Sequence, residues 1–187
     1  MGDPLCPPWA AAATVAVGGV VEGTPLAGTV SLAATARYAD GRRAGRFELF
    51  VDGVRTQAAA AGAPLALDTT KVADGWHELR VVAVDATPIA VQGAWIRDVE
   101  VKNGEGALSL TASQRVPLSG TLEVEVTSTA QEPAHVLHHG RVVGVVPRGS
   151  GVVQVAAQEL GKGRTTLHAE QLGATNLRSR TIAVEVQ

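Results

Sequence analysis

Three closely spaced histidines form the densest group of side chains in this sequence that could bind a metal. His135, His138 and His139 lie within one short segment, and imidazole nitrogen is a common ligand for zinc and copper. In a β-strand, His135 and His139 would point to one face and His138 to the other. We therefore expect at most a two-ligand surface site at His135 and His139. The alternative is that these are exposed polar residues at a hairpin end.

Aspartates recur at the predicted loops and strand ends of the first half of the chain, where oxygen ligands for calcium gather in sandwich proteins. They are Asp40, Asp52, Asp68, Asp74 and Asp85. No Asp-x-Asp-x-Asp spacing occurs, so turn formation by these side chains is the main expectation. Calcium at Asp52 and Asp74 is the alternative, and otherwise no cofactor is expected.

Two tryptophans and two arginines are the candidate ligand-binding residues. Trp76 and Trp95 offer flat rings on which the apolar face of a sugar stacks, although we expect that at least one of them fills a core built mainly of Ala and Val. Arg42 and Arg43, in the segment ADGRRAGRF, predict a solvated hairpin that would also serve as an exposed interaction loop.

A nucleophilic catalytic site is not predicted. Cys6 is the only cysteine and no histidine lies near it in the sequence, so neither a Cys-His pair nor an internal disulfide is expected. The sequence therefore predicts a chain without catalytic residues, which is not an enzyme.

Alternation of apolar and polar residues with a period of two indicates the elements that carry these side chains, and it predicts an all-β chain. Four strands are expected, over residues 29–37, 47–51, 77–85 and 94–101. In the first, Val30, Leu32, Ala34 and Ala36 share one face. Asp52-Gly53 follows the second strand and predicts a tight hairpin turn.

The pattern repeats after about half the chain. Gly28-Thr29-Val30 recurs as Gly120-Thr121-Leu122, FELFVDG recurs loosely as AHVLHHG, and both halves end in the tripeptide Val-Glu-Val. We therefore predict two tandem immunoglobulin-like β-sandwich domains, at residues 18–103 and 106–187, after an N-terminal segment at residues 1–17. The short Gly-rich stretch 102–106 predicts a connection with little swing, and thus a fixed, elongated tandem.

Composition excludes several functional classes. The chain of 187 residues is 45% hydrophobic and 18% charged, which is not the composition of a disordered protein. Its formal net charge of -2, without a basic block, does not predict nucleic-acid binding. The uncharged stretch over residues 4–21 is interrupted by prolines and glycines, so no membrane span is expected.

Residues 64–85, PLALDTTKVADGWHELRVVAVD, resemble a recurring element of bacterial immunoglobulin-like modules. FELFVDG matches the strand and turn that precede this element in that family, and the resemblance covers about residues 28–103. The opening residues Gly-Asp-Pro-Leu, at positions 2–5, resemble the end of gingipain-like, caspase-fold cysteine peptidase domains. In such proteins immunoglobulin-like modules commonly follow directly.

The resemblance implies a non-catalytic module of a secreted or cell-surface bacterial protein, acting as a spacer, stabiliser or adhesion module. Its expected partners are a neighbouring domain of the same polypeptide and a protein or polysaccharide, and the chain is expected to be a monomer. Two alternatives stay open. One is carbohydrate binding through exposed Trp76 or Trp95, and the other is an accessory region of a larger peptidase-like enzyme.

Overall fold

The chain folds almost entirely into β-strands in a computed structural model that describes residues 13–187, so Cys6 and the segment at positions 2–5 lie outside the described residues. Within these residues only two short segments are helical, η1 (Thr69–Lys71) and α1 (Ala157–Leu160). None of the described helices is long and apolar enough to cross a membrane. The prediction of an all-β chain is confirmed.

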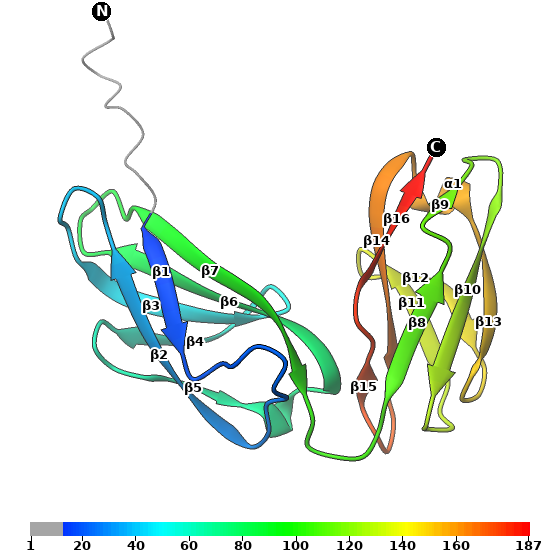
Figure 1. Ribbon diagram of the computed structural model, residues 1–187, viewed down its shortest axis with the longest axis horizontal. Coiled ribbons are helices and arrows are strands. Elements are labelled where there is room, and N and C mark those ends of the chain that lie inside the picture. Colours follow the sequence, from blue (N-terminus) through cyan, green and yellow to red (C-terminus); the bar gives the residue numbers. More distant parts are fainter. Residues whose placement is uncertain (1–12) are drawn as a thin grey trace, which may run out of the picture. The chain divides into compact units, whose positions relative to one another are not determined.

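The chain divides into two compact units. The described part of unit 1 comprises residues 13–68 and 78–99, and unit 2 comprises residues 69–77 and 100–187. Residues 69–77 belong to unit 2 through their contacts, although they lie between two segments of unit 1 in the sequence. Each unit is a sandwich of two β-sheets, as expected for tandem immunoglobulin-like domains (Figure 1).

Unit 1 packs a three-stranded sheet of order β1-β2-β5 against a sheet of order β4-β3-β6-β7. The last residues of β7 and the first of β6 belong to unit 2. The strands are β1 (Thr14–Gly18), β2 (Thr29–Arg37), β3 (Ala44–Val51), β4 (Val54–Ala60), β5 (Leu65–Asp68), β6 (Asp74–Asp85) and β7 (Gln92–Val101).

Strand β2 covers the predicted residues 29–37, and its even-numbered residues face the core as expected. The strand predicted at residues 77–85 begins earlier, at Asp74. Glu48 lies on the outer side of β3, and it is nevertheless buried. The guanidinium of Arg46 donates to Glu48 at 2.7 Å, and Arg55 lies 3.6 Å away on the neighbouring strand, so the carboxylate is covered by its ion partners.

Unit 2 has the same arrangement of two sheets. One has the order β13-β10-β8, and the other contains β12, β11, β14, β16 and β9 in that order, with the short β15 also paired to β14. The strands are β8 (Leu108–Ala112), β9 (Arg115–Val116), β10 (Thr121–Ser128), β11 (Ala134–His138), β12 (Arg141–Val146), β13 (Gly151–Ala156), β14 (Gly163–Gln171), β15 (Leu177–Arg178) and β16 (Ile182–Val186).

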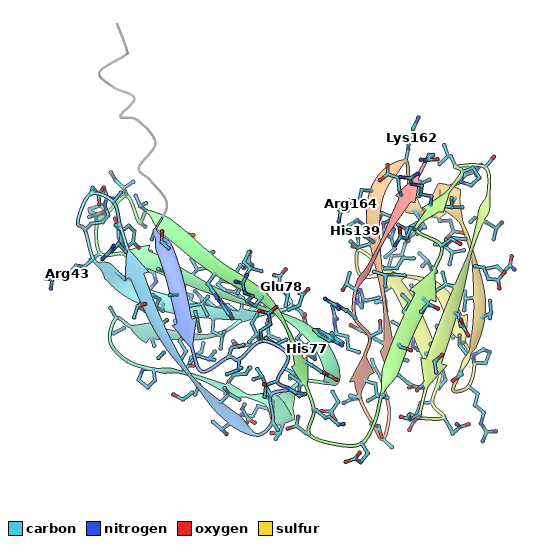
Figure 2. The ribbon with its side chains drawn as sticks, in the orientation of Figure 1. Arg43, His77, Glu78, His139, Lys162 and Arg164 are labelled. Carbon is cyan, nitrogen blue, oxygen red and sulfur yellow. The ribbon has the colours of Figure 1, made fainter. Side chains whose placement is uncertain are left out.

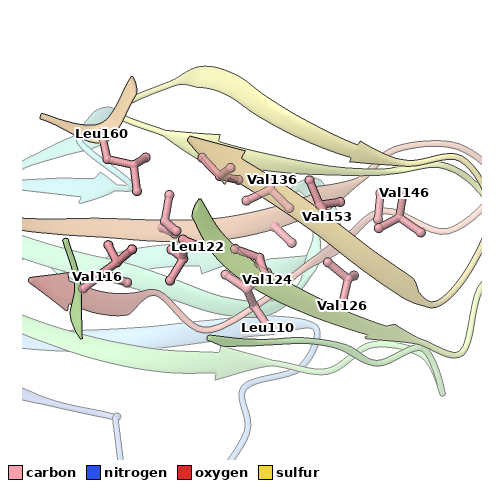
Figure 3. Packing of buried hydrophobic residues seen from close by; sticks show 14 of the residues in the cluster. Leu110, Val116, Leu122, Val124, Val126, Val136, Val146, Val153 and Leu160 are labelled. Carbon is pink, nitrogen blue, oxygen red and sulfur yellow. The ribbon is translucent and has the colours of Figure 1, made fainter. Parts of the chain in front are cut away.

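The core of unit 2 consists of Leu, Val and Ala side chains from both sheets (Figure 3). Alternation places Leu122, Val124 and Val126 of β10 inward, all nearly free of solvent contact, while Glu123 and Glu125 point outward. In unit 1 the fully buried core residues include Leu32, Leu49 and Leu79. Burying such side chains is the main source of stability in both sandwiches.

The internal repeat is visible in the two equivalent hairpins. In the β3–β4 turn, Asp52 and Gly53 have φ of 49° and 81°, and in the β11–β12 turn His139 and Gly140 have φ of 48° and 77°. Two positive φ values in succession characterise the type I′ hairpin turn. Each hairpin also carries a register shift at the same place, at Leu49/Phe50 and at Val136/Leu137.

Candidate functional site

The two arginines of the predicted interaction loop of unit 1 differ in their contacts: Arg42 is ion-paired and Arg43 is exposed. The Arg42 guanidinium contacts Asp40 Oδ2 at 2.5 Å and Asp85 Oδ2 at 2.7 Å, and the Asp85 side chain has no exposed surface. Arg42 is therefore occupied in joining the loop before β3 to the end of β6. Arg43 is exposed and extends away from the sandwich (Figure 2).

Asp85 is satisfied on all sides. Thr87 donates to it through its backbone N–H at 3.1 Å and its hydroxyl at 2.9 Å, in addition to Arg42. Burial alone would raise the pKa of this carboxyl, but the hydrogen bonds from Arg42 and Thr87 outweigh burial and hold the pKa below its ordinary value. The nearby Tyr38 has its pKa raised by burial and by the charge of Asp85.

The two candidate calcium ligands lie in different units and act in turns. In unit 1, Asp52 Oδ1 accepts the backbone N–H of Glu78 at 3.0 Å. In unit 2, Asp74 accepts the backbone N–H groups of Asn103 at 2.8 Å and Gly104 at 2.7 Å, one on each carboxylate oxygen. This hydrogen-bonded clip holds residues 103 and 104, which the sequence predicted to be part of the connection between the domains.

Gly75 explains why a glycine follows Asp74. Its φ is 120°, and a Cβ at this position would lie 1.8 Å from the carbonyl oxygen of Arg178. The close approach arises because Asp74 and Gly75 pair in parallel with β15, within unit 2. No larger residue fits this backbone position.

Neither candidate tryptophan is fully buried. Trp76 is half-buried in unit 2, where the Arg180 guanidinium lies 4.6 Å from the centre of its ring, and Trp95 is half-buried on β7. The expectation that at least one of these two tryptophans fills the core is wrong, since neither is among the buried residues that form it. Trp76 also lines a small cavity of about 110 Å³ with Gly106 and Leu108. Arg180 covers part of its ring, which leaves less of the ring available for a sugar.

The histidines do not share a strand face as predicted. His135 lies on β11, but that strand ends at His138, and His139 is in the turn with a left-handed backbone (Figure 2). The register shift at Val136/Leu137 further breaks the alternation. His138 Nε2 lies 2.6 Å from Thr165 Oγ1, and its ring centre is 4.3 Å from that of His139. Burial lowers the pKa of His138, followed by the neighbouring His139.

No group of three or more His, Cys, Asp or Glu side chains within residues 13–187 is arranged to hold a metal ion. Asp52, Asp74, His135 and His139 lie on four separate turns or strands. A metal at these residues stays a prediction from sequence alone.

An ion-paired cluster that sequence reasoning missed lies on the outer face of β14. Glu170 accepts from Arg178 on β15, and His168 Nε2 lies 3.3 Å from Glu170 Oε1. The interaction with His168, and then the charge of Arg178, lower the pKa of Glu170 despite its partial burial. The spacing of His168 and Glu170, two residues apart, is the only signal that could have placed them on one face.

A groove lies on the side of unit 2. It has a volume of about 710 Å³ and lies between β8 and β16, which are in contact along the side of the sandwich (Figure 1). Its walls include Leu110 and Ile182, and three arginines line it: Arg115, Arg164 and Arg180. The first and last of these arginines, Arg115 and Arg180, are 65 positions apart in the sequence, so their spacing did not indicate a common site.

Comparison with known proteins gives a structural likeness. No family model matches the chain, and no curated protein matches it. Among solved structures, the chain is similar to the fibronectin(III)-like modules of CbhA from Clostridium thermocellum, with 16% sequence identity and a TM-score of 0.41, over 92% of this chain and 93% of that one. The fold is assigned here from the strands and sheets of the chain itself.

Proposed function

We propose that the chain is a non-catalytic pair of β-sandwiches that acts as a spacer or stabilising module within a secreted or cell-surface bacterial protein. Its direct partner would be a neighbouring domain of the same polypeptide. The observation that carries this proposal is that carboxylates which could serve in catalysis are bound within their own sandwich. Asp85, Asp74 and Glu170 each bind loops or strands of their own sandwich.

These carboxylates are held by hydrogen bonds and ion pairs. A carboxylate with such partners is stabilised in its ionised form and holds the groups that donate to it in place. A catalytic acid or base needs the opposite, a group that exchanges a proton at the working pH. The low pKa values of Asp85 and Glu170 favour a role in fastening the fold.

Carbohydrate binding by Trp76 or Trp95 is the function against which the proposal is best tested. Tryptophan fluorescence should be measured with acrylamide quenching, in the presence of a panel of soluble neutral and acidic polysaccharides. The W76F and W95F variants assign the emission to each ring. We expect emission and quenching to stay unchanged with every polysaccharide. A saturable shift with one of them, lost in W76F or W95F, would replace the spacer role by sugar binding.

A further inference from the structure

The two strands that border the groove of unit 2 leave backbone groups unpaired on the groove side. Ala107 accepts the N–H of Thr129 at 3.0 Å, so its carbonyl faces β10. Because successive residues of a strand direct their N–H and C=O groups to opposite edges, Leu110 and Ala112 direct theirs to the groove. Within the described residues β8 pairs only with β10, so this edge has no neighbouring strand.

The same argument applies to β16. Glu185 donates its N–H to Gln114 at 2.8 Å, at the edge where β9 pairs. Ala183 has the same parity, so its N–H and C=O point to that edge too. Strand β9 begins at Arg115 and pairs only with Glu185 and Val186, so it does not reach Ala183. Ala183 is therefore an open hydrogen-bonding position.

The sheet change between β8 and β9 creates this opening. The chain leaves β8 at Ala112, crosses at residues 113–114, and continues as β9 in the opposite sheet. Leu110 and Ile182 form an apolar floor there, and both contact the core of unit 2.

The rim of the groove carries an excess of positive charge. Arg115, Arg164 and Arg180 are exposed, and Glu185 is the only acidic residue among the lining side chains. Glu185 is the register partner of both Arg164 and Arg115, so this acidic residue lies between two arginines on the neighbouring strands. Arg164 projects from β14, and Lys162 adds a further positive charge in the turn before it (Figure 2).

We propose that this groove binds an extended acidic peptide segment of a partner protein, which lies along the open edges of β8 and β16 as an added β-strand. Its backbone would bond to the open groups of Ala183 and Leu110, and alternate side chains would serve two purposes. Apolar side chains would meet Leu110 and Ile182, and acidic side chains would meet the arginines. A segment that alternates Val and Glu has this pattern. The inference is independent of the spacer role.

The test uses the full chain and a fluorescein-labelled hexapeptide of alternating Val and Glu, followed by fluorescence anisotropy. A Val and Lys peptide controls for charge, and the Val-Glu peptide with its two inner valines replaced by proline keeps the charge but cannot pair as a strand. We expect saturable binding of the Val-Glu peptide. Both control peptides should bind with a dissociation constant at least about tenfold higher than that of the Val-Glu peptide.

Charge variants of the protein locate the site. The R115E/R164E variant should weaken binding of the Val-Glu peptide about tenfold, and E185Q should strengthen it. The matched control is R43E/R148E, an equal double charge reversal at two exposed arginines that do not line the groove. Circular dichroism melting confirms that each variant is folded. Equal affinities for R43E/R148E and R115E/R164E would overturn the proposal.

Amide hydrogen exchange by NMR reads the pairing directly, and it needs no variant. On saturation with the Val-Glu peptide, the amides of Ala183 and of Leu110 or Ala112 should become protected. The outer edge of β12, which also lacks a neighbouring strand among the described residues, should not change. Binding of the peptide without protection at Ala183 and β8 would contradict an added strand. Binding of an acidic polysaccharide in preference to the peptide would also overturn the proposal.

Discussion

At the scale of single residues, the stability of unit 1 depends on a buried carboxylate and the groups that satisfy it. Asp85 has no exposed side-chain surface, and it keeps its charge because Arg42 and Thr87 donate to both of its oxygens. A buried charge without such partners is strongly unfavourable. Arg42 therefore contributes to the fold, while its neighbour Arg43 is free for contacts with other molecules.

The D85N variant tests this assignment. The amide cannot hold the Arg42 guanidinium as an ion pair, so Arg42 loses a partner and the melting temperature should fall. R43A, at the exposed residue that follows Arg42, should leave the melting temperature almost unchanged. Differential scanning calorimetry at pH 7 compares the two. Equal melting temperatures for D85N and R43A would show that the Arg42–Asp85 pair is unimportant.

The lowered pKa of Asp85 also has a consequence in acid. A carboxyl whose pKa is lower in the folded state stabilises the fold above its ordinary pKa of 3.8, and that contribution disappears as the pH falls through the folded value. Denaturant unfolding between pH 5 and about pH 2 should therefore show a loss of stability in the native chain that is smaller in D85N. Parallel curves for the two proteins would contradict this.

His138 should make the stability of unit 2 depend on pH in a higher range. Its pKa lies below the ordinary 6.5, so the unfolded chain takes up a proton first as the pH falls below that value, and the folded state loses stability. Urea unfolding at pH 7.5 and at pH 5.5 measures the loss. H138Q should reduce it, and H135Q should leave it in place. A larger pH dependence in H138Q would contradict the assignment.

At the scale of elements, sequence reasoning worked where a local rule determines the conformation. Alternation placed β2, and Asp52-Gly53 predicted a turn whose two positive φ values are observed. Sequence reasoning offered a hairpin end near the histidines but did not assign its turn to His139-Gly140, because His-Gly is not one of the dipeptides that signal a type I′ turn. The three histidines were placed on one strand for the same reason.

The groove could not be predicted because no local pattern encodes it. The lining arginines come from β9, β14 and the segment before β16, and only the pairing of these strands brings them together. The sheet change at residues 113–114 lies in an ordinary polar stretch. The burial of Glu48 was missed similarly, since Arg55 reaches it from the neighbouring strand.

The two hairpins predict a stabilising substitution. His139 has a φ of 48° without the backbone freedom of glycine or the local hydrogen bonding of asparagine, so H139N should stabilise unit 2 by about 0.5 kcal/mol. G53A and G140A should each lower the free energy of unfolding by about 1 kcal/mol, because both glycines have positive φ. An added Cβ meets no other atom at either position, so the strained backbone is the whole cost. Urea unfolding measures all three. Clearly unequal costs of G53A and G140A would contradict the equivalence of the turns.

At the scale of the whole molecule, each unit has its own core, so damage to one core should be felt mainly in that unit. Leu122 has 1% exposure at the centre of unit 2, and L122A should cost about 2 to 5 kcal/mol. Hydrogen exchange with mass spectrometry should show faster exchange in peptides of unit 2 and little change around Leu49 in unit 1. Equal acceleration in both units would show that they unfold as one.

A spacer of this kind requires that residues near the two ends of the described chain keep a fixed separation. Spin labels at T14C and Q187C, with Cys6 replaced by Ser, allow this distance to be measured by double electron–electron resonance. We predict one narrow distance distribution, which should broaden in D74N because Asp74 holds the backbone of Asn103 and Gly104. A broad distribution in the otherwise unchanged chain would contradict a spacer role.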